Sequence, residues 1–197
     1  MHKYIIFFFC ILTLEASAQM NPVTLDGLDD QAFQRNDILI SPGVSFAYFR
    51  GESFDHSREH GSLPPASINV DYGITDFLSA GILGGWNQRL YTHIPTDQEY
   101  AIDNIIFGVR SSFHYLHLLE KLHDSNLHSD RLDLYISISG AYRTRDVTVI
   151  DLEEEPSPYL IGATAGARYY FYRGFGLFAE GGYGIFGYGT VGLQFRL

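Results

Sequence analysis

The residues that come closest to a catalytic pattern are His123 and Ser125, in the order His123-Asp-Ser125-Asn126. A serine hydrolase needs a histidine base beside the nucleophilic serine, and an acid that orients the base. The surrounding residues 116–130 are predicted to form a turn, with one helical turn around 118–122. We expect no active site in this turn and predict that the chain is not an enzyme.

Two other groups of residues could bind metal ions. His56 and His60 are four residues apart, with Asp55 and Glu59 beside them. A loop without helical support does not fix that spacing, so a solvated polar loop is favoured. The acidic run 153–155 could attract calcium, but exposed acids in a run are usually just solvated. The chain has no phosphate-binding glycine loop and no cysteine-based site, and we expect no cofactor and no bound metal.

The N-terminus predicts export of the protein. Lys3 precedes a short apolar stretch, residues 4–14, and Ala16-Ser17-Ala18 offers a small-residue cleavage site. This pattern is typical of a secretory signal peptide over residues 1–18, and it is too short for a spanning helix. The only cysteine, Cys10, lies inside it, so the stability of the exported chain would depend on its sheet or on a bilayer.

Beyond the predicted signal peptide the chain divides into two parts. Residues 19–37 are polar and are expected to form a periplasmic lead-in, and residues 38–197 suit a single domain. That domain contains no run of 18 apolar residues, so no spanning helix is predicted. The net charge of −10 argues against nucleic acid as a partner. The 14 tyrosines, 15 phenylalanines and 20 glycines are typical of small β-barrels.

Apolar and polar residues alternate along the domain, which predicts strands with one apolar and one polar face. In the last segment, Val191, Leu193, Phe195 and Leu197 point one way, and the residues between them point the other way. In a soluble protein the apolar face would pack on a core, whereas in an outer-membrane barrel it faces lipid. Eight strands of about ten residues each are predicted, at 38–49, 66–75, 78–89, 104–115, 132–145, 161–169, 175–185 and 189–197.

Loop lengths and aromatic residues favour the membrane interpretation over a lipocalin-like barrel or a β-sandwich. Short turns at Thr75-Asp76 and Arg173-Gly174 contrast with long loops at 51–65, 93–100 and 147–158. The turn at 116–130 and a short final hairpin depart from this asymmetry. Two aromatic girdles are expected, an outer one from Trp86, Tyr48, Tyr91, Tyr142 and Tyr183, and an inner one from Tyr115, Tyr169, Phe171, Phe175 and Phe195.

Four segments resemble the small outer-membrane barrel family of OmpX and the OmpA transmembrane domain, in its Bacteroidetes-type branch. They are Val70–Ser79, Gly166–Phe171, Gly176–Gly184 and Gly189–Leu197. The resemblance covers essentially the whole exported chain, and it implies an all-β, eight-stranded antiparallel up-and-down transmembrane barrel with a polar, side-chain-filled interior. It also implies integration into the outer membrane of a Gram-negative cell, in contact with outer-membrane lipid and lipopolysaccharide.

The C-terminus is similar to the recognition signal that such barrels carry for the barrel-assembly machinery. Thr190, Gly192, Phe195 and Leu197 fill its positions, although Leu197 replaces the usual terminal aromatic residue. The residues assigned to this assembly signal are Gly192, Phe195 and Leu197. The His123-Asp-Ser125-Asn126 element resembles one in lipid A deacylases, which are also eight-stranded barrels. That family sets its pair on a strand at the outer surface, whereas here it falls in a turn expected in the periplasm.

An interior of eight strands is just wide enough for side chains or one small ligand. Buried charges persist only when they are paired and hydrogen-bonded, so the inward-facing charges are predicted to form a salt-bridge network that plugs the barrel. The predicted network comprises Asp71, Arg110, His114, Asp133, Arg143, Arg168, Glu180 and Arg196. Arg168 and Glu180 are roughly equidistant from the turn at Arg173-Gly174 and are expected to pair directly.

The function expected from these features is that of a non-enzymatic outer-membrane barrel. Its role would be structural, in surface display, or as an accessory to another outer-membrane protein. A narrow gated pore for small solutes is the alternative, and a lipid A deacylase is a remote one. The sequence does not identify a ligand or a partner.

Overall fold

The computed structural model describes residues 32–46, 57–94, 97–116, 119, 130–147, 158–172 and 174–197. Several predictions lie outside these residues: the signal peptide, most of the lead-in, Tyr48, Asp55, His56, the 153–155 run, and the His123–Asn126 element. The described strands are β1 (Ile38–Phe46), β2 (Ser57–Ser62), β3 (Ala66–Thr75), β4 (Leu78–His93), β5 (Gln98–His114), β6 (Leu132–Val147), β7 (Tyr159–Tyr172), β8 (Phe175–Tyr183) and β9 (Gly189–Arg196).

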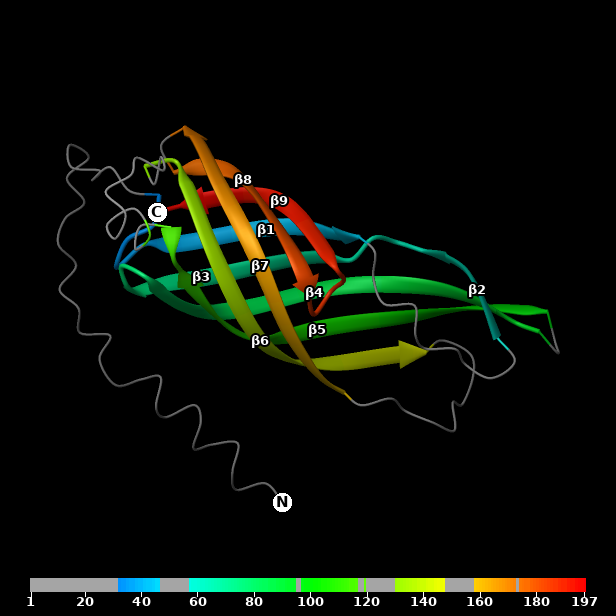
Figure 1. The fold of residues 1–197 in the computed structure, drawn as a ribbon. Coiled ribbons are helices and arrows are strands. Elements are labelled where there is room, and N and C mark those ends of the chain that lie inside the picture. The colour runs from blue at the N-terminus through cyan, green and yellow to red at the C-terminus, as the bar shows by residue number, and fades with distance from the viewer. Residues whose placement is uncertain are drawn as a thin grey trace, which may run out of the picture.

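The strands form one closed antiparallel barrel (Figure 1). From β3 onward each strand pairs with the next along the chain, and β1 closes the sheet by pairing with both β3 and β9. Closure pairs Ile40 with Phe195, and Val44 with Val191, so the two ends of the domain lie side by side. The architecture is therefore the predicted up-and-down barrel, whose wall has no free edge where the ring is complete.

Two strands share one position in the wall, so nine described strands make a barrel of eight. β2 pairs with residues 89–93 of β4, and β3 pairs with residues 78–86 of the same strand. Pro64 and Pro65 fall between them, where proline interrupts a ladder because it lacks an N–H donor. The prediction of a loop over 51–65 is wrong for Ser57–Ser62, which forms β2.

The prediction of a second long loop, at 93–100, is also wrong. β4 and β5 pair without interruption from Leu78↔Phe113 to His93↔Gln98. These strands have 16 and 17 residues, so they are much longer than the ten or so that a tilted strand needs to cross a bilayer. This continuation was not predicted from the sequence. Alternation of apolar and polar residues identifies only the part of a strand whose outer face is apolar, and both strands carry polar residues near their ends.

The two ends of the barrel differ. The terminal end holds Ile38, Leu197 and the tight turns after β3 and β7. At the extended end, β4, β5 and part of β6 continue beyond the Tyr142↔Tyr159 pair at which β7 joins the wall. We call this projecting sheet the blade, and it consists of β2 and residues 87–93, 98–104 and 143–147. Figure 1 shows it reaching past the ends of β8 and β9.

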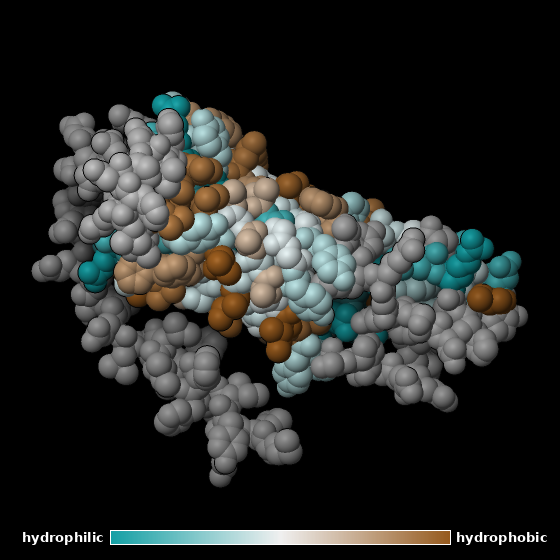
Figure 2. All heavy atoms as spheres, in the orientation of Figure 1, coloured by the Kyte–Doolittle hydropathy of each residue, from teal (hydrophilic) through white to brown (hydrophobic). Residues whose placement is uncertain are grey.

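The distribution of apolar residues is the reverse of that in a soluble protein. Ile161, Ile138 and Ile82 are 78%, 65% and 62% exposed on the outer face, whereas Arg168 and Asp71 are each 1% exposed inside. Apolar residues cover much of the barrel wall, and hydrophilic ones gather toward the tip of the blade (Figure 2). No helix among the described residues is long and apolar enough to cross a membrane.

Exposed aromatic residues lie toward both ends of the apolar band. At the terminal end they include Tyr72, Phe77, Tyr169, Phe171 and Phe195, and toward the extended end they include Phe46, Trp86, Tyr142, Tyr159, Tyr183 and Tyr188. The prediction that Tyr91 belongs to the outer girdle is wrong. Tyr91 is 2% exposed and stacks on Tyr100 inside the blade, because it is five residues from Trp86 and therefore on the opposite face of β4.

Candidate functional site in the barrel interior

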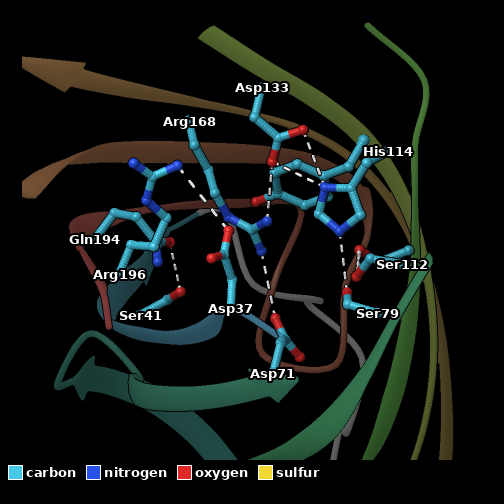
Figure 3. Close-up of polar contacts among 12 residues, drawn as sticks. Asp37, Ser41, Asp71, Ser79, Ser112, His114, Asp133, Arg168, Gln194 and Arg196 are labelled. Carbon is cyan, nitrogen blue, oxygen red and sulfur yellow. Dashed lines mark hydrogen bonds and ion pairs between the residues drawn. The ribbon is translucent and has the colours of Figure 1, made fainter. Parts of the chain in front are cut away.

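In the interior layer nearest the terminal end, charged side chains form one connected network. Arg168 of β7 donates from Nη1 to Asp133 of β6 at 3.0 Å and from Nη2 to Asp71 of β3 at 3.3 Å. His114 of β5 lies with Nδ1 at 2.9 Å from both carboxylate oxygens of Asp133. Figure 3 shows these side chains pointing toward one another from different strands. Each of the four residues is at most 4% exposed, so the pairing compensates their removal from water.

His114 also connects this network to Ser79 of β4, whose Oγ lies 3.0 Å from His114 Nε2. An ionised carboxylate only accepts hydrogen bonds, so Nδ1 donates to Asp133 and Nε2 can accept from Ser79. The connection Ser79–His114–Asp133 is that of a serine hydrolase triad, and the sequence did not suggest it because the three residues are far apart in the chain.

The surroundings of Ser79 do not support catalysis. Ser79 is 0% exposed, and the cavity described below has no member of the triad in its wall. The ring of Phe33 stacks on His114, with centroids 3.5 Å apart and planes at 10°. Asp133 is also held by Arg168, which leaves its carboxylate less free to stabilise a charged imidazole. The geometry is therefore that of a buried structural link, with the serine closed to solvent.

The middle layer is centred on Arg110 of β5 and Glu180 of β8. Arg110 Nη2 donates to Glu180 at 2.8 Å and to Ser137 at 2.7 Å, and its Nε lies 3.5 Å from Asp71. Tyr135 donates its hydroxyl to the same Glu180 oxygen at 2.8 Å. The layers are thus joined through Asp71, which contacts both Arg110 and Arg168.

The expected direct pair between Arg168 and Glu180 is wrong, since the structure pairs Glu180 with Arg110 and Arg168 with the two aspartates. The turn between β7 and β8 includes a register shift between Tyr170 and Tyr172. As a result Arg168 lies opposite Phe178, and Glu180 lies opposite Gly166. Glu180 therefore does not lie opposite Arg168. It is two residues further along β8, which is one inward-facing position nearer the extended end.

An apolar layer lies above the charged ones, toward the extended end. Leu83, Ile106 and Ala141 are buried there, and Ile185 and Phe186 from the short connection between β8 and β9 pack against them. A cavity separates this layer from the middle one and has about 30 Å³ of space for the centres of water molecules. That is room for about two waters. Its wall includes Asn69, Arg110, Ser137, Glu180 and Phe186.

At the terminal end, residues 32–37 fold against the terminal opening of the barrel. Asn36 donates its N–H to Gly73 O at 2.8 Å, and Phe33 is 4% exposed. Asp37 lies 4.0 Å from Arg196 Nη1 and accepts a hydrogen bond from the N–H of Gln34 at 2.8 Å. Burial nevertheless dominates and raises the pKa of Asp37 to about 6, against the opposing effects of Arg196 and Gln34.

The predicted network residues fall into three groups. Six form the charged layers: Asp71, Arg110, His114, Asp133, Arg168 and Glu180. Arg196 lies near the terminal opening, where it contacts Asp37 and is 5.3 Å from the ring centroid of Tyr170. Arg143 faces inward on the blade, in the row of Ile106 and so beyond the charged layers. The site also contains Tyr135, Ser79 and Phe33, which were not among the predicted network residues.

The residues predicted as an assembly signal lie on both faces of β9 and at its end. Phe195 and Leu197 are 36% and 75% exposed on the apolar side. Gly192 faces inward, where a Cβ atom would meet the ring of Phe178 at 2.6 Å. Within the described residues no group of three or more histidine, cysteine or acidic side chains could hold a metal ion. Glu59, one of the suggested ligands, is exposed on β2.

Comparison with known proteins gives a likeness in fold. No protein-family model and no curated protein matches the chain. Among solved structures, the outer membrane protein OprG from Pseudomonas aeruginosa matches with a TM-score of 0.51 and 10% identity, over 86% of this chain and 99% of that chain. The N-terminal β-barrel domain of OprF from Pseudomonas aeruginosa matches with a TM-score of 0.44 and 15% identity, over 83% and 99%. The likeness to OprG, together with the sheet topology, shows that this chain has the fold of a small eight-stranded antiparallel barrel.

Proposed function

We propose that this protein is an integral outer-membrane barrel that acts as a sealed anchor and holds the blade at the cell surface. The observation that carries the proposal is the filling of the interior by two charged layers and one apolar layer. Side chains of β3, β5, β6, β7 and β8 meet in the charged layers, and the β8–β9 connection closes the apolar one. A barrel filled in this way supports an anchor better than a conduit.

The outer face supports the position in a bilayer. Trp86 donates from Nε1 to Asp103 at 3.1 Å on the lipid-facing side, and Gln88 donates to the same carboxylate at 3.1 Å. Toward the terminal end from this cluster the outer face of β5 is apolar, with Ile105, Phe107 and Val109 all more than half exposed. A tryptophan that joins an apolar band to polar groups is typical of a membrane–water interface.

The orientation follows from the two ends. Short turns and both ends of the barrel domain lie at the terminal end, which is the arrangement expected on the periplasmic side. The blade then lies outside the cell. Its outward polar residues, including Asp103 and Asp146, would stand in water beyond the lipid. Partners in the proposed setting are lipopolysaccharide around the wall, the barrel-assembly machinery during insertion, and another surface protein at the blade.

Conductance of the purified protein in planar bilayers tests the proposal. A sealed anchor gives no steps above the baseline at moderate voltage, whereas steady small-conductance steps would favour the alternative, a narrow pore. The cavity between the middle and apolar layers is the observation that favours this alternative. Fractionation of cells that express the protein, with a heat-modifiability gel, tests membrane insertion separately.

A further inference from the structure

The inner face of the blade brings together a row of polar and cationic side chains. Cross-strand register places Asn87 of β4 opposite Asn104 of β5, and Asn104 opposite Arg145 of β6. Arg89 is two residues further along β4, and Arg143 is two residues before Arg145 on β6. Residues two apart on a strand share a face, so all five lie on the inward face, at the mouth that the barrel has at its extended end. We call them the mouth cluster.

Charge on this face has the opposite sign to that of the chain. Three guanidinium groups lie within three adjacent strands, whereas the whole chain has a net charge of −10. Among the described blade residues, the acidic side chain on this face is that of Glu59 of β2, which lies opposite Tyr91 of β4. Arg145 and Asn87 are separated by two strand spacings, about 10 Å, a gap that long arginine side chains can span toward one ligand. Such a concentration of cationic groups attracts a compact anion with several charges.

Neutral groups of the same face add hydrogen-bonding capacity. Tyr100 stacks on Tyr91 with ring centroids 5.5 Å apart. Asn87, Asn104 and Tyr100 are 9%, 4% and 4% exposed. Three of their polar atoms have no hydrogen-bond partner among the described parts of the chain, namely Asn87 Oδ1, Asn104 Oδ1 and Tyr100 Oη. Buried polar atoms of this kind normally have a partner, and hydroxyl groups of a ligand would supply it.

The floor beneath the mouth cluster is apolar. The cluster meets this floor at Arg143, which lies in one cross-strand row with Ile106 and Gly85. Ile106 belongs to the apolar layer with Leu83 and Phe186. An anion at the cluster would therefore be stopped at this layer, since passage through it would cost the anion its hydration. The arrangement is that of a binding site with a closed base.

We propose that the mouth cluster binds a phosphorylated saccharide. Arginine guanidinium groups match phosphate oxygens in geometry and charge, and the asparagine amides and Tyr100 hydroxyl match sugar hydroxyls. None of the three arginines is without a partner in the structure, so the ligand must exchange with existing contacts. The inference rests on the proposed function in one respect, namely that the blade lies outside the cell, where such saccharides occur free or as lipopolysaccharide headgroups.

Titration calorimetry of the barrel refolded in detergent micelles tests the site at low ionic strength. The expected result is binding of glucose 6-phosphate and at least about tenfold weaker binding of glucose, since the phosphate supplies the charge-assisted hydrogen bonds. Arg145→Ala and Arg89→Ala should each weaken glucose 6-phosphate binding by about tenfold. Arg58→Ala is the matched control, because Arg58 is an exposed arginine on the outer face of β2, paired with Thr92.

A second arm identifies the source of the phosphate. Phosphatidylcholine vesicles with and without lipopolysaccharide are titrated with the same variants. Binding that depends on lipopolysaccharide and on Arg145 assigns the site to the lipid headgroup, and binding of glucose 6-phosphate assigns it to a free ligand. The proposal is overturned if neither probe binds the unchanged protein, or if Arg58→Ala weakens binding as much as Arg145→Ala. These results would leave the outer-membrane assignment intact, because fractionation tests that independently.

Discussion

The guanidinium carbon of Arg168 lies 4.0 Å from the centroid of the Tyr135 ring, in the middle of the barrel. Both residues are buried, and each also bonds to a carboxylate, Arg168 to Asp133 and Tyr135 to Glu180. One contact therefore connects the two charged layers. A cation over a desolvated ring face is stabilising, by about 2 kcal/mol in favourable cases. Loss of either residue should affect both layers.

Replacement of Arg168 should destabilise the barrel more than any surface change. Arg168→Met keeps much of the side-chain volume but leaves Asp71 and Asp133 without their shared cation. Breaking a buried pair in this way costs about 3–5 kcal/mol. Urea unfolding of the refolded protein, followed by the shift between folded and unfolded bands on a gel, measures the loss. Arg131→Ala is the control and should change stability by less than about 0.5 kcal/mol, since Arg131 is 61% exposed in its pair with Asp130.

Removal of the Tyr135 hydroxyl should have a smaller effect. Tyr135→Phe keeps the ring beneath Arg168 and leaves Glu180 with Arg110 as its partner, so the expected cost is about 1–2 kcal/mol. Gly166→Val should be worse, because a Cβ atom at Gly166 would meet the Tyr135 hydroxyl at 2.6 Å. The same unfolding measurement separates the two. Equal stability of Gly166→Val and the unchanged protein would contradict the packing described here.

Asp37 should make stability depend on pH. Its pKa is about 6 in the folded state against an ordinary value of 3.8, so the folded state binds the proton more tightly. The resulting stability is present below pH 3.8 and is lost as pH rises through about 6, by roughly 3 kcal/mol at most. Asp37→Asn should therefore lose less stability than the unchanged protein between pH 4 and pH 7. Parallel pH profiles of the two proteins would rule the effect out.

Phe33 should protect His114 from the terminal end of the barrel. In the structure its ring covers the imidazole, which is 2% exposed. Phe33→Ala should let diethyl pyrocarbonate modify His114, whereas the unchanged protein should be modified there slowly or not at all. Peptide mapping by mass spectrometry reports the site, and His93 on the blade serves as an internal reference because it is half-buried in both proteins. Rapid modification of His114 in the unchanged protein would mean that the terminal opening of the barrel is not covered.

The sequence was sufficient to predict the barrel, because alternation along each strand decides which residues face outward. From that alternation alone it assigned Asp71, Asp133 and Arg168 to the polar face, and in the structure each is at most 4% exposed. It could not predict which charges pair, since pairing depends on register shifts such as that between Tyr170 and Tyr172.

The blade and the cover of the terminal opening were also beyond prediction from the sequence. The extension of β4 beyond Trp86 has polar residues on both faces, so it resembled a loop. Phe33 was missed because it lies in a polar lead-in, where one aromatic residue gives no pattern. Ser79 is on the polar face of the strand predicted at 78–89, but only the fold brings it to His114.

The central claim is that the apolar face of the strands contacts lipid while the polar face is sealed inside. Adjacent residues Ile138 and Ser139 of β6 test it most directly, since they point to opposite faces and the described barrel contains no cysteine. A spin label on Ile138→Cys, in a barrel reconstituted into vesicles, should be relaxed by oxygen dissolved in the lipid and little by a water-soluble nickel chelate. The label on Ser139→Cys should be shielded from lipid. Strong relaxation of the Ile138 label by the nickel chelate, with the Ser139 label in contact with lipid, would contradict the account.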